Sequence, residues 1–330
     1  MNTIGFWLKN ARPVALPQSL LPALTMLCFA AGKAGFSLPL ALIAVAGVVV
    51  GHLAMNLFDD YFDYRLKRTS FRRQLQHRGM RARISKCQYL ESGAATLNQL
   101  LCACFIFGAL SLVAGFIIWS QRGNLVLVLA ATTAILGISY SGAPLRLSYH
   151  GLGEIVIGLM FGPLLMAGVY FSACGSLDRS ALFVSVPVGL LVANIVYTHS
   201  IMDYEPDREA GKMTFAVLLK SRNRMLFCLL ALLIGAYAGI AWGVIAGFLS
   251  VYYLFTLLTI PTAASLFYMM WEFVHHPDRP FTPRFWMGPM GDWVRLQSIG
   301  IDWFMIRWLT ARNLLAFFCL ILILVSLVDL

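Results

Sequence analysis

Nine apolar runs of about 20 residues each, the length that one membrane-crossing helix needs, follow one another along the 330-residue sequence. They cover residues 14–32, 36–57, 94–119, 124–141, 152–174, 181–202, 225–247, 248–271 and 311–330. Lipid offers no hydrogen-bond partner to an open backbone, so such runs must fold as helices. The sequence therefore predicts an all-α, polytopic membrane protein with about nine transmembrane helices.

Composition excludes the main alternative classes. Hydrophobic residues make up 59% of the chain and charged residues only 12%, whereas a soluble domain has about 25% charged residues. The net charge of +10 would suit a nucleic-acid partner, but the sequence contains no helix-turn-helix or zinc-finger pattern. Its seven cysteines form no C-x-x-C pair, so we expect neither disulfides nor zinc. The expected partner of this surface is the lipid bilayer, and we expect no nucleic acid.

Basic residues indicate the orientation of the chain. The N-terminus and the loops after the second, fourth, sixth and eighth runs hold 22 of the 25 Lys and Arg residues, counting Arg312 at the start of the ninth run. Lys33, Arg122 and Arg179 lie on the opposite side. Basic loops stay in the cytoplasm. The sequence thus predicts one membrane domain, 1–330, in a bacterial inner membrane, with a cytoplasmic N-terminus and cytoplasmic cap loops at about 58–93, 203–224 and 272–310.

Seven of the fifteen acidic residues gather in two short stretches, at the cytoplasmic ends of the second and sixth runs. They are Asp59, Asp60, Asp63, Asp203, Glu205, Asp207 and Glu209. If the second run continues as a helix, steps of about 100° place Asn56, Asp60 and Asp63 on one face. In the second stretch Asp203 and Asp207 stack at i, i+4, and Pro206 requires a helix break or kink nearby.

Stacked carboxylates at a membrane boundary repel one another, so a positive charge must offset them. Magnesium does so while joining one or two carboxylates to substrate phosphates, and the Asn56 amide lies on the same face. Basic residues follow each cluster, and those we select as phosphate ligands are Arg65, Arg72, Arg208 and Lys212. Acids for a metal beside bases for phosphate predict a diphosphate site. The alternative is ordinary helix-end acids together with positive-inside bases.

The two stretches resemble the aspartate-rich motifs of UbiA-type aromatic prenyltransferases, and more narrowly of the branch that prenylates dihydroxynaphthoate for menaquinone. Asn56, Asp60, Tyr61 and Asp63 match the first motif of that branch, Asn-x-x-x-Asp-Tyr-x-Asp. The segment Asp207–Thr214 matches its second motif, Asp-Arg-x-Ala-Gly-Lys-x-Thr. Tyr140–Pro144 and Gly151–Glu154 resemble its central loop. His199 and Ser200 stand where the branch has two asparagines.

The resemblance implies nine helices around a central cavity and magnesium-dependent transfer of a polyprenyl group from its diphosphate to an aromatic quinone precursor. Magnesium would be held by Asp60, Asp63, Asp203 and Asp207, with Lys212 and nearby arginines adding charge at the leaving group. The ring would then attack the allylic carbon and a base would remove the ring proton. Asp59 is either a further metal ligand or a solvated neighbour. The implied acceptor is 1,4-dihydroxy-2-naphthoate.

Further residues are candidates for substrate binding, each with a structural alternative. Glu154 and Arg146 could bind substrate or could pair with each other. Tyr140 and Tyr149 could line the pocket or lie at the membrane interface, and His199 could accept the ring proton or be a core histidine. Two other functions stay open at this point. The chain could be a hydroxybenzoate, haem or chlorophyll type of the same family, or an ion-coupled secondary transporter.

Overall fold

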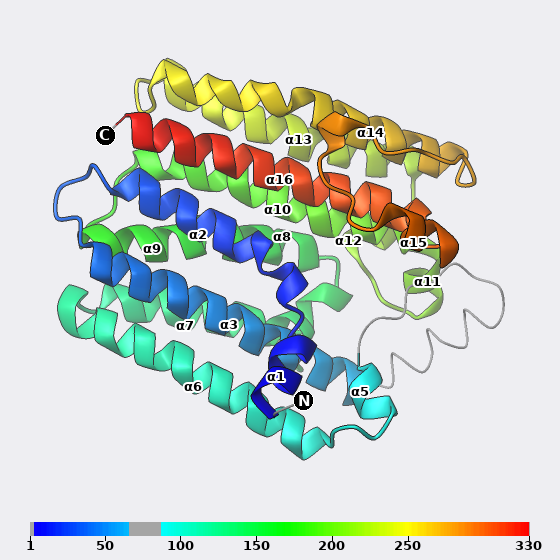
Figure 1. The fold of residues 1–330 in the computed structure, drawn as a ribbon, viewed down its shortest axis with the longest axis horizontal. Coiled ribbons are helices and arrows are strands. Elements are labelled where there is room, and N and C mark those ends of the chain that lie inside the picture. Colours follow the sequence, from blue (N-terminus) through cyan, green and yellow to red (C-terminus); the bar gives the residue numbers. More distant parts are fainter. Residues whose placement is uncertain (1–2, 66–86, 330) are drawn as a thin grey trace.

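The computed structural model describes residues 3–65 and 87–329 and shows them as a bundle of long helices lying side by side (Figure 1). The long helical segments are α2 (Pro17–Ala30), α3 (Leu38–Arg65), α6 (Leu97–Arg122), α7 (Leu125–Ser141), α8 (Gly153–Leu159) continuing through η3 (Met160–Leu164) into α9 (Leu165–Cys174), α10 (Ser180–Met202), α13 (Arg222–Ile245), η4 (Val251–Thr259) continuing into α14 (Ile260–His275), and α16 (Asp302–Val328).

Short elements connect the long ones. They are α1 (Thr3–Asn10), η1 (Pro13–Ala15), α5 (Gln88–Glu91), η2 (Leu147–Tyr149), α11 (Tyr204–Glu209), α12 (Phe215–Leu219), η5 (Phe285–Met287) and α15 (Trp293–Ser298). Figure 1 shows that α5, α11, α12 and α15 lie at one end of the bundle, and that the C-terminus lies at the other end. We call the first the motif end, because the two acidic stretches lie there.

The all-α membrane fold is confirmed. Seven described helices are long and apolar enough to cross a membrane, and α2 and α7 are shorter apolar helices. These segments correspond to the predicted runs, so nine is a fair approximate count. Within the described ranges no strand forms, although His150 and Met213 pair in an isolated parallel bridge.

Two predicted boundaries were wrong. Helix α3 continues to Arg65 and α16 begins at Asp302, so the loops expected at 58–93 and 272–310 are shorter than predicted. Apolar periodicity does not detect these extensions, because polar residues occupy the ends of both helices. The extension of α3 places the whole first acidic stretch on a helix.

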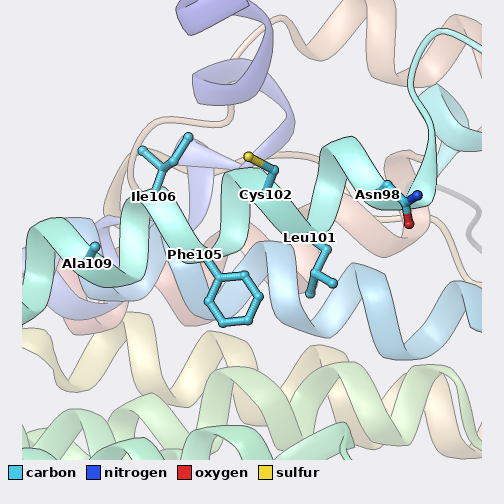
Figure 2. Close-up of a pocket in the computed structure, with 6 residues that line it drawn as sticks. All are labelled: Asn98, Leu101, Cys102, Phe105, Ile106 and Ala109. Atoms are coloured by element: carbon cyan, nitrogen blue, oxygen red, sulfur yellow. The ribbon is translucent and has the colours of Figure 1, made fainter.

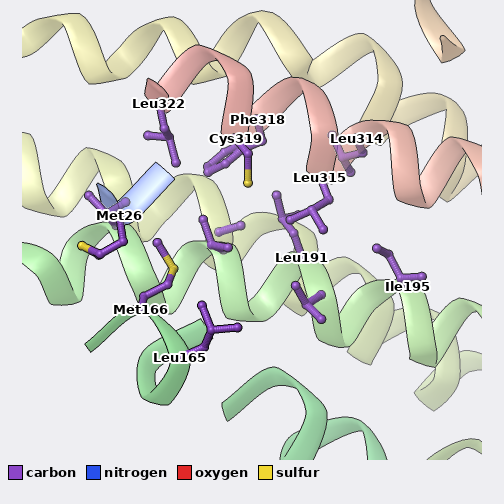
Figure 3. Close-up of a cluster of buried hydrophobic side chains, with 14 of the residues drawn as sticks. Met26, Leu165, Met166, Leu191, Ile195, Leu314, Leu315, Phe318, Cys319 and Leu322 are labelled. Carbon is purple, nitrogen blue, oxygen red and sulfur yellow. The ribbon is translucent and has the colours of Figure 1, made fainter. Parts of the chain in front are cut away.

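Helix α16 packs at the centre of the bundle. Figure 3 shows Leu314, Leu315 and Phe318 of α16 among side chains from α9 and α10. These three side chains have no exposed surface. In lipid, packing of this kind holds helices together by van der Waals contact, because the tails outside are as apolar as the core.

Helices α8–η3 and α10 approach each other through glycines. A Cβ built on Gly162 would lie 2.4 Å from the Gly189 Cα, and one built on Gly189 would lie 2.6 Å from the Gly158 carbonyl oxygen. Small residues permit such close backbone contact in membranes. Pro163 lies in the π-helical turn η3, whose wider hydrogen-bond spacing accommodates a residue without an N–H.

We expect Gly162→Ala to lower the free energy of unfolding by about 1–3 kcal/mol, because the added methyl meets backbone rather than a movable side chain. Thermal unfolding in detergent measures the change as a lower Tm. Gly108→Ala is the matched control, since nothing lies within 4 Å of a Cβ at that helical glycine. Equal Tm values for the two variants would contradict the close helix contact.

Candidate active site

The first acidic stretch lies on the last turns of α3. One side of these turns is apolar and buried: Leu57 has no exposed surface, and Tyr61 and Tyr64 pack in the same cluster beside α5 and α6. This packing explains why the helix persists through three aspartates. Asp60 is only 1% exposed, and Asp59 and Asp63 are half-buried.

Each of these aspartates contacts a different part of the chain. Asp59 Oδ1 accepts a hydrogen bond of 2.6 Å from Ser141 Oγ at the end of α7. Asp60 Oδ2 accepts one of 3.2 Å from Tyr89 Oη in α5. Asp63 Oδ1 accepts one of 2.6 Å from Tyr149 Oη. The three carboxylates thereby hold the elements of the motif end against α3.

Arg12 lies beside the same cluster. Its Nη2 is 3.2 Å from Asp59 Oδ2 and 3.2 Å from Asp60 Oδ1. Burial opposes the charge of Arg12, but the carboxylates of Asp60 and Asp59 outweigh burial and raise the pKa of the guanidinium above its usual range. Arg12 therefore stays charged and offsets part of the repulsion within the cluster.

Asn56 has a different contact from the one that the sequence suggested. Its side-chain Nδ2 donates a hydrogen bond of 2.9 Å to the Ala11 carbonyl oxygen. The backbone carbonyl oxygen of Asn56 accepts a hydrogen bond of 2.8 Å from Arg12 Nη2. Asn56 thus fixes the segment between α1 and η1 to the first motif. Its role as a ligand in catalysis stays a prediction.

The second acidic stretch lies where α10 ends and α11 begins. The helix breaks at Asp203, and Tyr204 opens α11, so Pro206 falls in a first turn where an N–H is not needed. The predicted break near Pro206 is confirmed. The Asp207 backbone N–H donates to the Asp203 carbonyl oxygen over 2.8 Å. Both aspartates are almost fully buried, with 1% and 2% exposed.

Tyr149 joins the two motifs. Its hydroxyl donates to Asp63 of the first motif, and its ring lies 5.7 Å from Lys212 Nζ of the second. The parallel bridge between His150 and Met213 holds the two backbones together at the same place. Asp63, Tyr149 and Lys212 therefore come together at the motif end although they lie far apart in the sequence.

Glu154 at the start of α8 is 5% exposed. Its Oε1 accepts a hydrogen bond of 2.5 Å from Ser200 Oγ on α10, so its contact is with Ser200 and not with Arg146. Glu154 Oε2 is buried and has no hydrogen-bond partner among the described residues. A buried carboxylate oxygen in this state can accept a hydrogen bond from a substrate.

The remaining candidates lie around this centre. His199 Nε2 is 3.0 Å from Asp203 Oδ2, and the half-buried Tyr140 lies beside Gly153 at the start of α8. Arg146 is half-buried and adopts a left-handed conformation before η2. Arg65 and Arg208 are exposed and contact Tyr61 and Glu205 on their own helices. Arg72 lies outside the described residues.

The donor chemistry suits magnesium shared with a substrate. Within 3–65 and 87–329, no three Asp, Glu, His or Cys side chains form a group that could hold a metal by themselves. Magnesium is commonly bound by one or two carboxylates together with substrate phosphates, and the two motifs supply hard oxygen donors at one end of the bundle. The predicted ligands Asp60, Asp63, Asp203 and Asp207 fit that mode. Asp59, whose oxygens contact Ser141 and Arg12, stays either a further ligand or a neighbour of the site.

A pocket of about 520 Å³ lies elsewhere, along the outer face of α6 (Figure 2). It is lined by Asn98, Leu101, Cys102, Phe105, Ile106 and Ala109. Phe105 is 63% exposed, and none of the lining residues is charged. This groove suits lipid tails and not a diphosphate. It is not the central cavity that the sequence suggested, which stays a prediction.

Sequence reasoning missed three side chains that hold the candidate site together. Arg12 contacts Asp59 and Asp60, Tyr89 contacts Asp60, and Ser200 contacts Glu154. Arg12 was counted only as one of the bases on the cytoplasmic side. Its position directly before Pro13 and the first apolar run was the available signal, because a base there lies at the depth of the helix ends.

Comparison with known proteins identifies the family. Residues 19–288 match the UbiA prenyltransferase family. The chain belongs to this family. A UbiA homolog from Archaeoglobus fulgidus bound to GPP and Mg2+ has the same fold, with a TM-score of 0.59 and 17% identity over 94% of this chain and 99% of that one.

Several curated UbiA relatives are similar in sequence. The 1,4-dihydroxy-2-naphthoate octaprenyltransferase of Haemophilus influenzae is 27% identical over 260 residues, which are 77% of this chain and 82% of that protein. The protein of that name from Mycobacterium tuberculosis is 25% identical over 232 residues, 69% and 74% of the two chains. UbiA prenyltransferase domain-containing protein 1 of Dictyostelium discoideum is 38% identical, over 30% of each chain.

Tyr149→Phe tests the junction between the motifs. We expect kcat/KM for prenyl transfer to fall about 10- to 100-fold, because a hydrogen bond to a charged group contributes about 1.5–3 kcal/mol. The ring beside Lys212 remains, so the loss reports on the Asp63 contact. Tyr252→Phe, an exposed tyrosine in η4, is the control and should leave turnover unchanged. Full activity of Tyr149→Phe would show that the hydroxyl does not position Asp63.

Proposed function

We propose that this UbiA-family protein transfers a polyprenyl group from its diphosphate to 1,4-dihydroxy-2-naphthoate, with magnesium as cofactor. The observation that carries the proposal is the junction at Tyr149, where an aspartate of the first motif and the lysine of the second come together. A carboxylate at the hydroxyl of one tyrosine and a cation over its ring form a site that can receive metal and diphosphate together.

The residues divide into two groups by the charge they meet. Asp60, Asp63, Asp203 and Asp207 would hold magnesium, which when bound supplies positive charge to the leaving diphosphate. Lys212 donates to the phosphate oxygens as the allylic C–O bond breaks. Arg72 and Arg208 are further candidates for the same anion, as proposed from the sequence.

The acceptor side of the proposal centres on Glu154. Its buried Oε2 accepts a hydrogen bond from a ring hydroxyl, while Ser200 holds Oε1 and fixes the carboxylate. The electron-rich ring attacks the allylic carbon. The attacked carbon then restores the aromatic system by losing a proton, or its carboxylate as carbon dioxide. Removal of water from such a site protects the allylic cation.

Two observations favour the naphthoate over the other acceptors of the family. The first motif has the spacing Asp60-Tyr61-Phe62-Asp63, which resembles the menaquinone branch. Two relatives that cover more than two thirds of this chain carry the name 1,4-dihydroxy-2-naphthoate octaprenyltransferase.

The acids also lie at one end of the bundle together with bases, an arrangement that favours an enzyme over a transporter with acids at mid-span.

A direct competition tests the proposed reaction. Purified protein in detergent receives magnesium, one labelled polyprenyl diphosphate, and 1,4-dihydroxy-2-naphthoate with 4-hydroxybenzoate in equal amounts. We expect prenylated naphthoate as the main product, since a site that binds a substrate's polar groups rejects analogues lacking them by a factor on the order of 10⁴. Chelation should stop turnover and added magnesium restore it.

Each other outcome has a distinct meaning. Prenylated hydroxybenzoate as the main product would reject naphthoate as the acceptor but leave the assignment as a prenyltransferase intact. Turnover that survives the chelator would reject magnesium as the cofactor. Asp207→Asn serves as the matched variant, and it should lower turnover about 10²–10³-fold because one carboxylate that would hold magnesium at the leaving diphosphate is lost.

We further propose that the motif end faces the cytoplasm of a bacterial cell, because 22 of the 25 Lys and Arg residues lie on that side. Asn223→Cys, at the start of α13 near the motif end, should react with a membrane-impermeant maleimide only from the cytoplasm. Leu177→Cys, in the exposed connection between α9 and α10, should react only from outside. Reversed labelling would overturn the orientation.

A further inference from the structure

We propose that Arg12 is a positioning residue that makes metal binding at the first motif depend on diphosphate. The Arg12 guanidinium lies in the carboxylate cluster as a built-in cation. A metal held by Asp60 would compete with this guanidinium for the carboxylate, and a diphosphate would compensate the added positive charge. The inference rests on the proposed function, since it concerns the metal and the diphosphate of that same site.

The contacts of one nitrogen atom carry the argument. Arg12 Nη2 has two hydrogens, and these are directed to the Asn56 carbonyl oxygen at 2.8 Å and to Asp59 Oδ2 at 3.2 Å. The third contact of Nη2, 3.2 Å to Asp60 Oδ1, is an ion pair. Asp60 Oδ1 is therefore held to Arg12 by charge, and contact of this oxygen with a metal would break neither directed hydrogen bond of Arg12; Asp60 Oδ2 accepts from Tyr89.

The backbone keeps Arg12 in place while this happens. Arg12 adopts a left-handed conformation, with φ 58° and ψ 60°, between α1 and η1. The neighbouring Ala11 is fully buried, and its carbonyl oxygen accepts the Asn56 side-chain hydrogen bond. A non-glycine residue in this conformation is strained, and the surrounding contacts hold it there. Together with its two directed hydrogen bonds, this backbone holds the guanidinium as a charge in one place.

A fixed cation beside a metal site acts in two opposite ways. It competes for the Asp60 oxygen and repels a second cation, so a metal ion alone binds weakly. Once a diphosphate is present, its negative charge is attracted to the same guanidinium, and the repulsion is offset. Reciprocal linkage then requires that diphosphate strengthens metal binding and that metal strengthens diphosphate binding by the same factor.

The test measures metal binding without turnover. The full chain in detergent is titrated with Mn2+, and free Mn2+ is followed by electron paramagnetic resonance, with and without inorganic diphosphate. For Arg12→Gln we expect Mn2+ alone to bind about tenfold more tightly than to the wild type, because a competing cation is removed. We also expect the enhancement of binding by diphosphate to become smaller. Arg12→Lys retains the charge and should stay close to the wild type.

Arg122→Gln is the matched control. Arg122 at the end of α6 donates to the carbonyl oxygens of Gly35, Ser172 and Ala173, so its loss removes similar backbone contacts without touching the acidic motifs. It should leave Mn2+ affinity unchanged. Thermal unfolding of every variant shows whether the fold is retained.

The outcomes separate this inference from the proposed function. If Arg12→Gln binds Mn2+ alone as the wild type does, or more weakly, then Arg12 only docks the N-terminal segment and the inference fails. If the Asp207→Asn variant binds Mn2+ as tightly as the wild type does, then the metal is not at the motifs and the proposed function fails. If Arg12→Gln does not fold, the charge-retaining Arg12→Lys and the wild type provide the test. Mn2+ binding that diphosphate does not strengthen in these two proteins would overturn the inference.

Discussion

Repulsion among buried carboxylates is the constraint around which the motif end is built. Asp60, Asp203 and Asp207 are almost entirely shielded from water, where an uncompensated negative charge is costly. The chain meets this cost at Asp60 with the Tyr89 hydroxyl and the Arg12 guanidinium, and His199 lies 3.0 Å from Asp203. Each of these partners comes from a different segment, so compensating the charges also assembles the site.

The sequence predicted the helices well, because apolar runs and membrane thickness are tied by simple geometry. It also predicted that the two acidic stretches lie on one side, since both follow even-numbered runs. It did not predict that α3 continues to Arg65. A helix end that is apolar on one side and acidic on the other shows no continuous apolar run, and only its packing against α5 and α6 reveals its length.

Contacts between distant segments were the harder part. Asn56 was predicted to take part in catalysis because of its position in the first motif, yet its side-chain amide donates to the Ala11 carbonyl oxygen. Glu154 was weighed against a pairing with Arg146, but its contact is Ser200. In both cases the partner lies close in space but far away in the sequence. Spacing along a single helix gives no information on which helix lies opposite.

The glycine contact between η3 and α10 has a consequence for how this site can change. Because Gly162 and Gly189 bring the two backbones together, α8 and α10 pack closely as one unit, with Glu154 on α8 and with His199 and Asp203 at the end of α10. The acids that we propose to bind the acceptor and the metal would therefore keep a fixed separation. New acceptor shapes would have to be accommodated from the opposite wall, through α3 and α7. Because the last turns of α3 carry Asp60 and Asp63, substitutions that leave the proposed diphosphate site undisturbed would have to lie on α7 or on earlier turns of α3.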